Sequence, residues 1–113
     1  MALGLIEVFG FTTAIIAADA AAKAAAVEIA AMDINKPAAG DAAEVPLIVQ
    51  VKIQGGVSEV EHAVLAGVEA AKRMNQFVAS HVISREADGS AAMARISDIG
   101  KDKLRKIRSD EVQ

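Results

Sequence analysis

The side chains that could carry chemistry in this chain are few and scattered along the sequence. The two histidines, His62 and His81, fall on different predicted elements, so they do not form the i, i+4 pair that places two imidazoles on one helix face for a metal. We interpret each as a solvated or hydrogen-bonded structural histidine. Glu7 interrupts an apolar run, but a single carboxylate without a partner group makes no acid–base mechanism. We expect the backbone or a neighbouring subunit to hold Glu7, and we predict that the protein is not an enzyme.

Motifs for nucleotide binding and nucleophilic catalysis are also absent from the sequence. It contains no G-x-G-x-x-G, no G-x-x-x-x-G-K-[ST] and no G-x-S-x-G. It contains no cysteine, which excludes disulfides, thiolate metal sites, iron–sulfur clusters and cysteine nucleophiles, and fits a reducing compartment. We therefore expect no cofactor and no metal.

Composition limits the partners that this chain can have. Its 113 residues suit one domain, and 53% hydrophobic residues argue against disorder. The balance of 12 basic and 15 acidic residues gives a net charge of −3, and three Phe with no Trp or Tyr leave little for bases to stack on. We expect no nucleic-acid partner. The chain has 25 alanines, so its core should be thin and part of its stability should come from neighbouring subunits.

The first third of the chain resembles neither an export signal nor a membrane span. No positive charge precedes the apolar stretch over 8–18, and Glu7 lies where a signal peptide would be basic. Asp19, Lys23 and Glu28 then interrupt before the roughly 20 apolar residues that a span needs. We expect a cytoplasmic protein that does not enter a membrane.

Short apolar runs and alanine-rich stretches predict the order β-α-β-β-α-β, followed by a C-terminal helix. This is the ferredoxin-like split βαβ arrangement, an α+β fold with four antiparallel strands and two helices on one face. The loop over 34–46 contains two prolines and is long by the usual priors, which makes it functional or mobile. The predicted elements are a strand over 3–9, a helix to about 25, strands over 27–32 and 47–54, a helix ending near 75, a strand over 77–84, and the last helix.

Helix signals fix the expected starts and faces of the two inner helices. Thr12 or Thr13 can cap the first helix, and Ser58 with Glu61 makes a capping box for the second. Asp19 and Lys23 stand at i, i+4 in the favourable order. The second helix should bury an apolar stripe of Val60, Val64, Gly67, Ala71 and Met74. In the strand over 47–54, Leu47, Val49, Val51 and Ile53 face one way, and Gln50, Lys52 and Gln54 the other.

The chain divides into a domain over 1–90 and a C-terminal basic helix or tail over 91–113. Five basic residues lie between Lys101 and Arg108, with acidic residues interleaved. We interpret the basic run as a solvated helix face. The alternative is a surface for nucleic acid or an acidic membrane.

Four segments, in this order, resemble a bacterial microcompartment shell protein with a single BMC domain. They are 2–10, 13–23, 56–63 with the small pairs at 66–67 and 70–71, and 81–85. The resemblance implies a permuted ferredoxin-like topology and a function without chemistry. Six copies would form a flat cyclic hexamer, and hexamers would tile into the shell of an organelle that encloses enzymes, with a central pore for small metabolites. The implied partners are a homo-hexamer, other shell proteins and the encapsulated enzymes.

The resemblance also assigns roles to particular residues. Lys23 and Arg85 fall on the family's edge lysine and arginine, where one hexamer meets the next. The chain departs from the family at Ala26, where Asn is frequent, and at Ser84, where Pro is frequent. The family's pore loop is usually short and glycine-rich, whereas here it is expanded, and without cysteine it cannot hold a metal cluster. The implied pore-loop residues are Asn35, Lys36, Pro37, Ala38, Ala39, Gly40, Asp41 and Glu44.

Other functions fit the same predicted fold. A signalling trimer resembling the PII family shares the ferredoxin-like fold and has a long loop between its second and third strands. A ferredoxin-like oligomer with an unspecified binding role and an enzyme of the same fold are further alternatives. Symmetry distinguishes them, because six-fold sheets indicate the shell tile, and three-fold symmetry with nucleotide binding indicates the signalling protein.

Overall fold

A computed structural model describes residues 1–35 and 47–85, and it confirms the predicted order of the first six elements, β-α-β-β-α-β. The predicted C-terminal helix, the boundary at residue 90 and most of the long loop lie outside the described residues. The elements are β1 Ala2–Phe9, α1 Phe11–Ala24, β2 Glu28–Asn35, β3 Ile48–Gly55, α2 Val57–Arg73 and β4 Phe77–Ile83.

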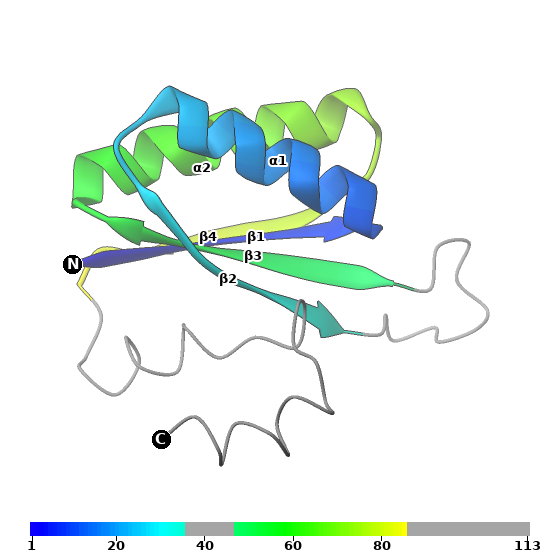
Figure 1. Ribbon diagram of the computed structural model, residues 1–113, viewed down its shortest axis with the longest axis horizontal. Coiled ribbons are helices and arrows are strands. Elements are labelled where there is room, and N and C mark those ends of the chain that lie inside the picture. The colour runs from blue at the N-terminus through cyan, green and yellow to red at the C-terminus, as the bar shows by residue number, and fades with distance from the viewer. Residues whose placement is uncertain (36–46, 86–113) are drawn as a thin grey trace, which may run out of the picture.

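The four strands form one antiparallel sheet in the order β2-β3-β1-β4. The two helices lie side by side on one face of this sheet, as Figure 1 shows. Each helix therefore connects two strands that have a third strand between them, which is the split βαβ arrangement. The predicted α+β class, the antiparallel sheet and the placement of both helices on one face are confirmed.

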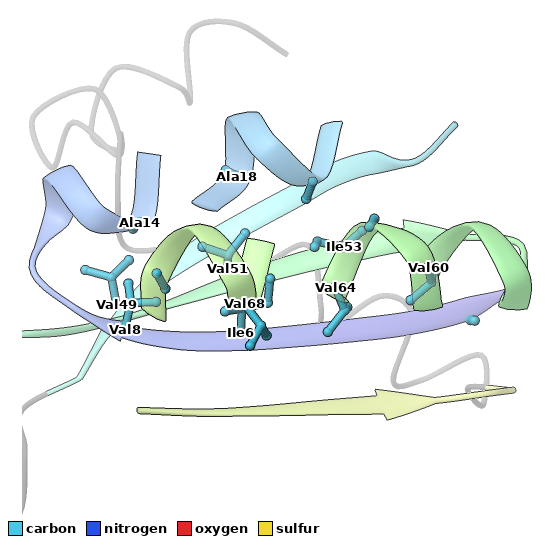
Figure 2. Close-up of a cluster of buried hydrophobic side chains, with 14 residues drawn as sticks. Ile6, Val8, Ala14, Ala18, Val49, Val51, Ile53, Val60, Val64 and Val68 are labelled. Atoms are coloured by element: carbon cyan, nitrogen blue, oxygen red, sulfur yellow. The ribbon is translucent and has the colours of Figure 1, made fainter. Parts of the chain in front are cut away.

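The core lies between the helices and the helix-facing side of the central strands. Alternate residues of β1 and β3 point into it, as the spacing predicts. Helix α1 buries only Thr13 and alanines there, so its backbone lies close to the sheet. The labelled side chains in Figure 2 are Ile6, Val8, Val49, Val51 and Ile53 from the sheet, and Ala14, Ala18, Val60, Val64 and Val68 from the helices.

Gly67 shows how closely the two helices approach. A Cβ atom at this position would lie 2.6 Å from Cδ1 of Ile6 and 3.0 Å from the carbonyl oxygen of Ala17. Only a hydrogen side chain fits such a contact. The predicted apolar stripe of α2 is confirmed for Val60, Val64, Gly67 and Ala71, which are buried, and wrong for Met74, which is exposed at the C-cap.

Both predicted helix caps are wrong, because glycines occupy the N-cap positions. Helix α1 follows β1 directly, and Gly10 caps it at a φ of 87°, a conformation that threonine rarely adopts. Thr13 is buried inside the helix. Helix α2 likewise follows β3 without a loop, so Gly56 is its N-cap and Ser58 already lies in the first turn. The tight strand-to-helix connections decide these caps, and side-chain preference does not.

Candidate functional site

The sheet has two ends, and the predicted site residues divide between them. We call the end where β1 starts the proximal end. There Ala2 pairs with Gly55, Leu3 with Ile83, and β2 begins. At the opposite end, which we call the distal end, Phe9 pairs with Ile48.

Both predicted edge residues lie at the proximal end. Lys23 is in the last turn of α1, just before the chain enters β2 at Glu28. Arg85 follows the last residue of β4, Ile83, by two residues and is exposed. Lys23 precedes β2 and Arg85 follows β4, which are the two border strands of the sheet. The proximal end therefore presents both cations to solvent.

Lys23 is exposed and ion-paired within its own helix. Its Nζ lies 2.8 Å from Oδ2 of Asp19, and 75% of its side chain is accessible. This confirms the predicted i, i+4 pair. The hydrogen bond to Asp19 and the charge of that carboxylate raise the pKa of Lys23 above its ordinary value of 10.5, so Lys23 is charged at neutral pH.

The turn that follows Lys23, residues 25–27, is held by a contact that the sequence does not reveal. We call it the α1–β2 turn. The backbone N–H of Val27 donates to the carbonyl of Ala25 over 3.0 Å. The N–H of Ala26 donates to Oε1 of Glu59 over 3.1 Å, across 33 residues of sequence. Glu59 lies in the first turn of α2, so the start of this helix is tied to the end of the other.

The segment predicted to line a pore leaves and re-enters the sheet at the distal end. Asn35 is the last residue of β2 and pairs with Ile48 at the start of β3. This pairing places both ends of the intervening segment side by side. The remaining predicted pore residues, Lys36, Pro37, Ala38, Ala39, Gly40, Asp41 and Glu44, lie outside the described residues.

The sheet face opposite the helices, here called the open face, carries polar side chains of β3 beside apolar side chains of β1. Gln50, Lys52 and Gln54 of β3 point to it, as predicted, but Lys52 and Gln54 are only 8% and 2% exposed. Lys52 forms an ion pair with Asp33 of the neighbouring strand. The predicted end of this strand at residue 32 is wrong. Strand β2 runs to Asn35, because the residues from Asp33 onward continue the pairing with β3.

Glu7 and His81 also lie on the open face, where they line a shallow hollow. Its other walls are Leu5, Gln50, Ala79 and Ser80. Glu7 is half-buried and His81 is exposed, while His62 is exposed on α2. Among residues 1–35 and 47–85, no three His, Cys, Asp or Glu side chains gather where they could hold a metal ion. The histidines lie on separate elements, as predicted.

Large apolar side chains are exposed on both flanks of the subunit. Ile34 on edge strand β2 and Val78 on edge strand β4 are each more than a third exposed. On the helices, Leu65 is 58% exposed, and Phe11 and Ile15 are 45% exposed. Apolar side chains at the edge strands would leave water if another protein chain covered them. Neither helix in the described part of the chain is long and apolar enough to cross a membrane.

Comparison with known proteins assigns the chain to a family. The model of the BMC domain matches residues 2–86. The chain belongs to the BMC-domain family. The match covers all six described elements, so the resemblance found in the sequence is confirmed.

The similar proteins are components of microcompartment shells. Carboxysome shell protein CcmK1 of Thermosynechococcus vestitus is 40% identical over 87 residues, which cover 75% of this chain and 69% of that protein. Bacterial microcompartment shell protein PduK of Citrobacter freundii is 36% identical over 77% of this chain and 51% of its own length. A microcompartment protein from Desulfitobacterium hafniense has a similar solved structure, with a TM-score of 0.66 and 32% identity over 80% of this chain.

This chain spans about half of the Desulfitobacterium hafniense protein, 47% of its length. The relatives are named as shell proteins, and the comparisons support a structural role in a shell. They do not favour the PII-like signalling trimer.

Proposed function

We propose that this chain is a structural shell protein of a bacterial microcompartment, which forms a hexameric tile with a central passage for small metabolites. The match of the BMC-domain model to residues 2–86 carries this proposal, together with relatives named as shell proteins. The tile would meet copies of itself and other shell proteins at its edges. It would enclose enzymes without taking part in their reactions.

The positions of the two ends of the sheet support a tile. A flat ring with a passage needs one part of each subunit at the centre and another at the rim. Lys23 and Arg85 lie at the proximal end, and the segment after Asn35 departs from the distal end. Strand β1 has eight residues, so the two ends are about 25 Å apart at about 3.3 Å per residue. A subunit with its distal end at the axis would carry both cations at the rim.

The flanks of the subunit support ring closure. A cyclic ring of identical subunits uses two different surfaces of each copy, which contact each other in turn. Here both borders of the sheet are edge strands, and each carries an exposed apolar residue, Ile34 on β2 and Val78 on β4. Burying such residues between copies removes apolar surface from water and covers the open strand edges.

In this tile, each predicted segment would have a place. Lys23 and Arg85 would form the contact between hexamers, and the segment over 35–44 would surround the passage. The domain over 1–90 would form the tile itself, and the tail over 91–113 would be attached to it. Lys23 and Arg85 lie at the proximal end of the sheet, whereas the segment over 35–44 begins at the distal end, which favours this division of roles.

Light scattering coupled to size-exclusion chromatography, followed by electron microscopy of concentrated protein, tests the proposal. We expect a species of six subunits at micromolar concentration, with little monomer, and two-dimensional hexagonal sheets on the grid. A monodisperse monomer would overturn the proposal. A trimer that binds nucleotides would instead support the PII-like alternative.

A further inference from the structure

We propose that Gly55 and Glu59 position the α1–β2 turn and thereby set the geometry of the contact between hexamers. This inference rests on the proposed function, because it concerns the edge that Lys23 would form. It assigns a positioning role to two residues that make no contact across the edge themselves. We call Gly55 and Glu59 the turn seat.

The hydrogen bond from Ala26 to Glu59 fixes the position of the turn more than it stabilises the subunit. The bond is exposed, so water would replace the Glu59 carboxylate as acceptor at little cost. The N–H of Val27, also in the turn, is already bonded to the carbonyl of Ala25. The link to Glu59 therefore joins the turn to the first turn of α2.

Gly55 forms the other side of the turn seat. It is the last residue of β3, and a Cβ atom there would lie 3.3 Å from Cγ1 of Val27 and 3.4 Å from the carbonyl oxygen of Ala26. The first distance is tighter than most contacts of a Cβ atom and the second is an ordinary contact, so an added methyl group would displace Val27, and with it the turn, by a few tenths of an ångström. The turn thus lies against Gly55 and is tied by Glu59.

The geometry of the proposed edge makes it sensitive to such small shifts. Lys23 precedes the turn by two residues, in the last turn of α1. If Lys23 lies against its counterpart on the next hexamer, a displacement of the α1–β2 turn changes the contact on both sides, because each hexamer contributes one copy of the turn. Contacts within the ring use the flanks of the subunit, away from this turn, and should not respond.

The test compares three substitutions at the turn seat with a neighbouring control. Glu59→Ala removes the acceptor, and we expect the protein concentration at which sheets appear to rise about fivefold or more, because the displaced turn weakens the edge contact from both sides. Glu59→Gln keeps an acceptor oxygen and should tile like wild type. Gly55→Ala should impair tiling in the same way as Glu59→Ala. Gly56→Ala adds a methyl group in ordinary contact with Cγ of Glu59, at 3.9 Å, and needs no shift of that side chain, so it should lower thermal stability slightly as a poorer N-cap without changing the sheets.

The outcomes separate this inference from the proposed function. If the wild-type protein forms neither rings nor sheets, the proposed function is wrong. If wild type forms sheets and Glu59→Ala forms them at the same concentration, the positioning role is wrong. If Glu59→Ala loses the ring, or if Glu59→Gln behaves like Glu59→Ala, the residue acts through subunit stability or charge, and the inference is overturned.

Discussion

Lys23 combines two properties that suit a contact between identical edges: a long apolar stem and a charge that is already partly compensated. Its methylene groups can pack while the ammonium stays at the rim. The neighbouring Asp19 carboxylate, 2.8 Å away, reduces the repulsion between two lysines that approach each other. A single substitution at this position should therefore separate tiling from ring formation.

Lys23→Glu is expected to leave the hexamer intact and to abolish sheets or tubes. The introduced carboxylate would repel both its counterpart and the adjacent Asp19, and it could not donate hydrogen bonds to backbone carbonyls across the edge. Size-exclusion chromatography reports the ring, and electron microscopy reports the sheets. A mutant that tiles like wild type would show that Lys23 is away from the edge.

Tiling through Lys23 should not change between about pH 7 and about pH 9. The hydrogen bond and charge of Asp19 raise the pKa of Lys23 above 10.5, so the cationic form is favoured in the folded protein. Any contribution of this charge is fully present below 10.5 and is lost only as the pH rises through the raised value. Sheet yield measured across this range by light scattering checks the prediction, and a steady loss of sheets by pH 9 would point to another titrating group.

Lys52 on the open face should be important for stability. It is 8% exposed and paired with Asp33, so Lys52→Met would remove this ammonium group from beside a half-buried carboxylate. We expect a loss of about 2 kcal/mol, less than for a fully buried pair because Asp33 reaches water. The shift of the urea midpoint at fixed protein concentration measures this. The double variant Lys52→Met with Asp33→Leu should recover most of the loss, and an unchanged midpoint for Lys52→Met alone would contradict the prediction.

The two helices lie so close together at Gly67 that a larger residue there should destabilise the fold. Gly67→Ala would normally stabilise a helix by about 1 kcal/mol. Here the added methyl group meets the Ala17 carbonyl oxygen at 3.0 Å, and a backbone atom cannot move away as a side chain can. We therefore expect a net destabilisation of about 2 kcal/mol. Thermal and urea unfolding measure it, with Glu69→Ala on the exposed side of α2 as the control, and a stabilised Gly67→Ala would contradict the close approach.

The sequence predicts the elements well where periodicity is strong. The alternation of Val49, Val51 and Ile53 identifies β3 and its core face, and alanine content identifies α1. Prediction from the sequence fails where a residue distant in the sequence, but adjacent in space, determines the local structure. Gly10 and Gly56 cap the helices because the strands run directly into them, and polar Asp33 stays in β2 because Lys52 lies beside it.

The candidate site is predictable only in part, for the same reason. The pair of Asp19 and Lys23 is local, so the spacing along one helix reveals it. The bond between Ala26 and Glu59 joins residues 33 positions apart, and Glu59 looks like an ordinary first-turn acid of a helix. That Lys23 and Arg85 reach the same end of the sheet follows from the antiparallel directions of the strands, which the predicted order of elements implies but no local pattern around either residue shows.

At the scale of the whole assembly, the proposed passage would gather charge from six copies of one segment. The pairing of Asn35 with Ile48 brings both ends of the segment to the distal end of the sheet. Each copy carries Lys36 against Asp41 and Glu44, which is +1 − 2 = −1, so six copies sum to −6. A narrow passage between low-dielectric walls focuses such a field and concentrates counter-ions.

We therefore expect the passage to favour cations and neutral polar molecules over anions. The double substitution Asp41→Lys with Glu44→Lys changes each copy from −1 to +3 and the ring from −6 to +18, so the preference should reverse. The reversal potential across a layer of hexamers in a planar bilayer, measured under a salt gradient, reports this sign directly. Glu69→Lys on the exposed side of α2 is the control, because it adds positive charge to every subunit through an element that does not carry the segment. If that control shifts the potential as much as the double variant, or if the double variant leaves it unchanged, the net charge of the tile or other residues set the selectivity. A reversal confined to the double variant would assign the selectivity to Asp41 and Glu44, because wild type and the double variant differ only in the charge of that segment.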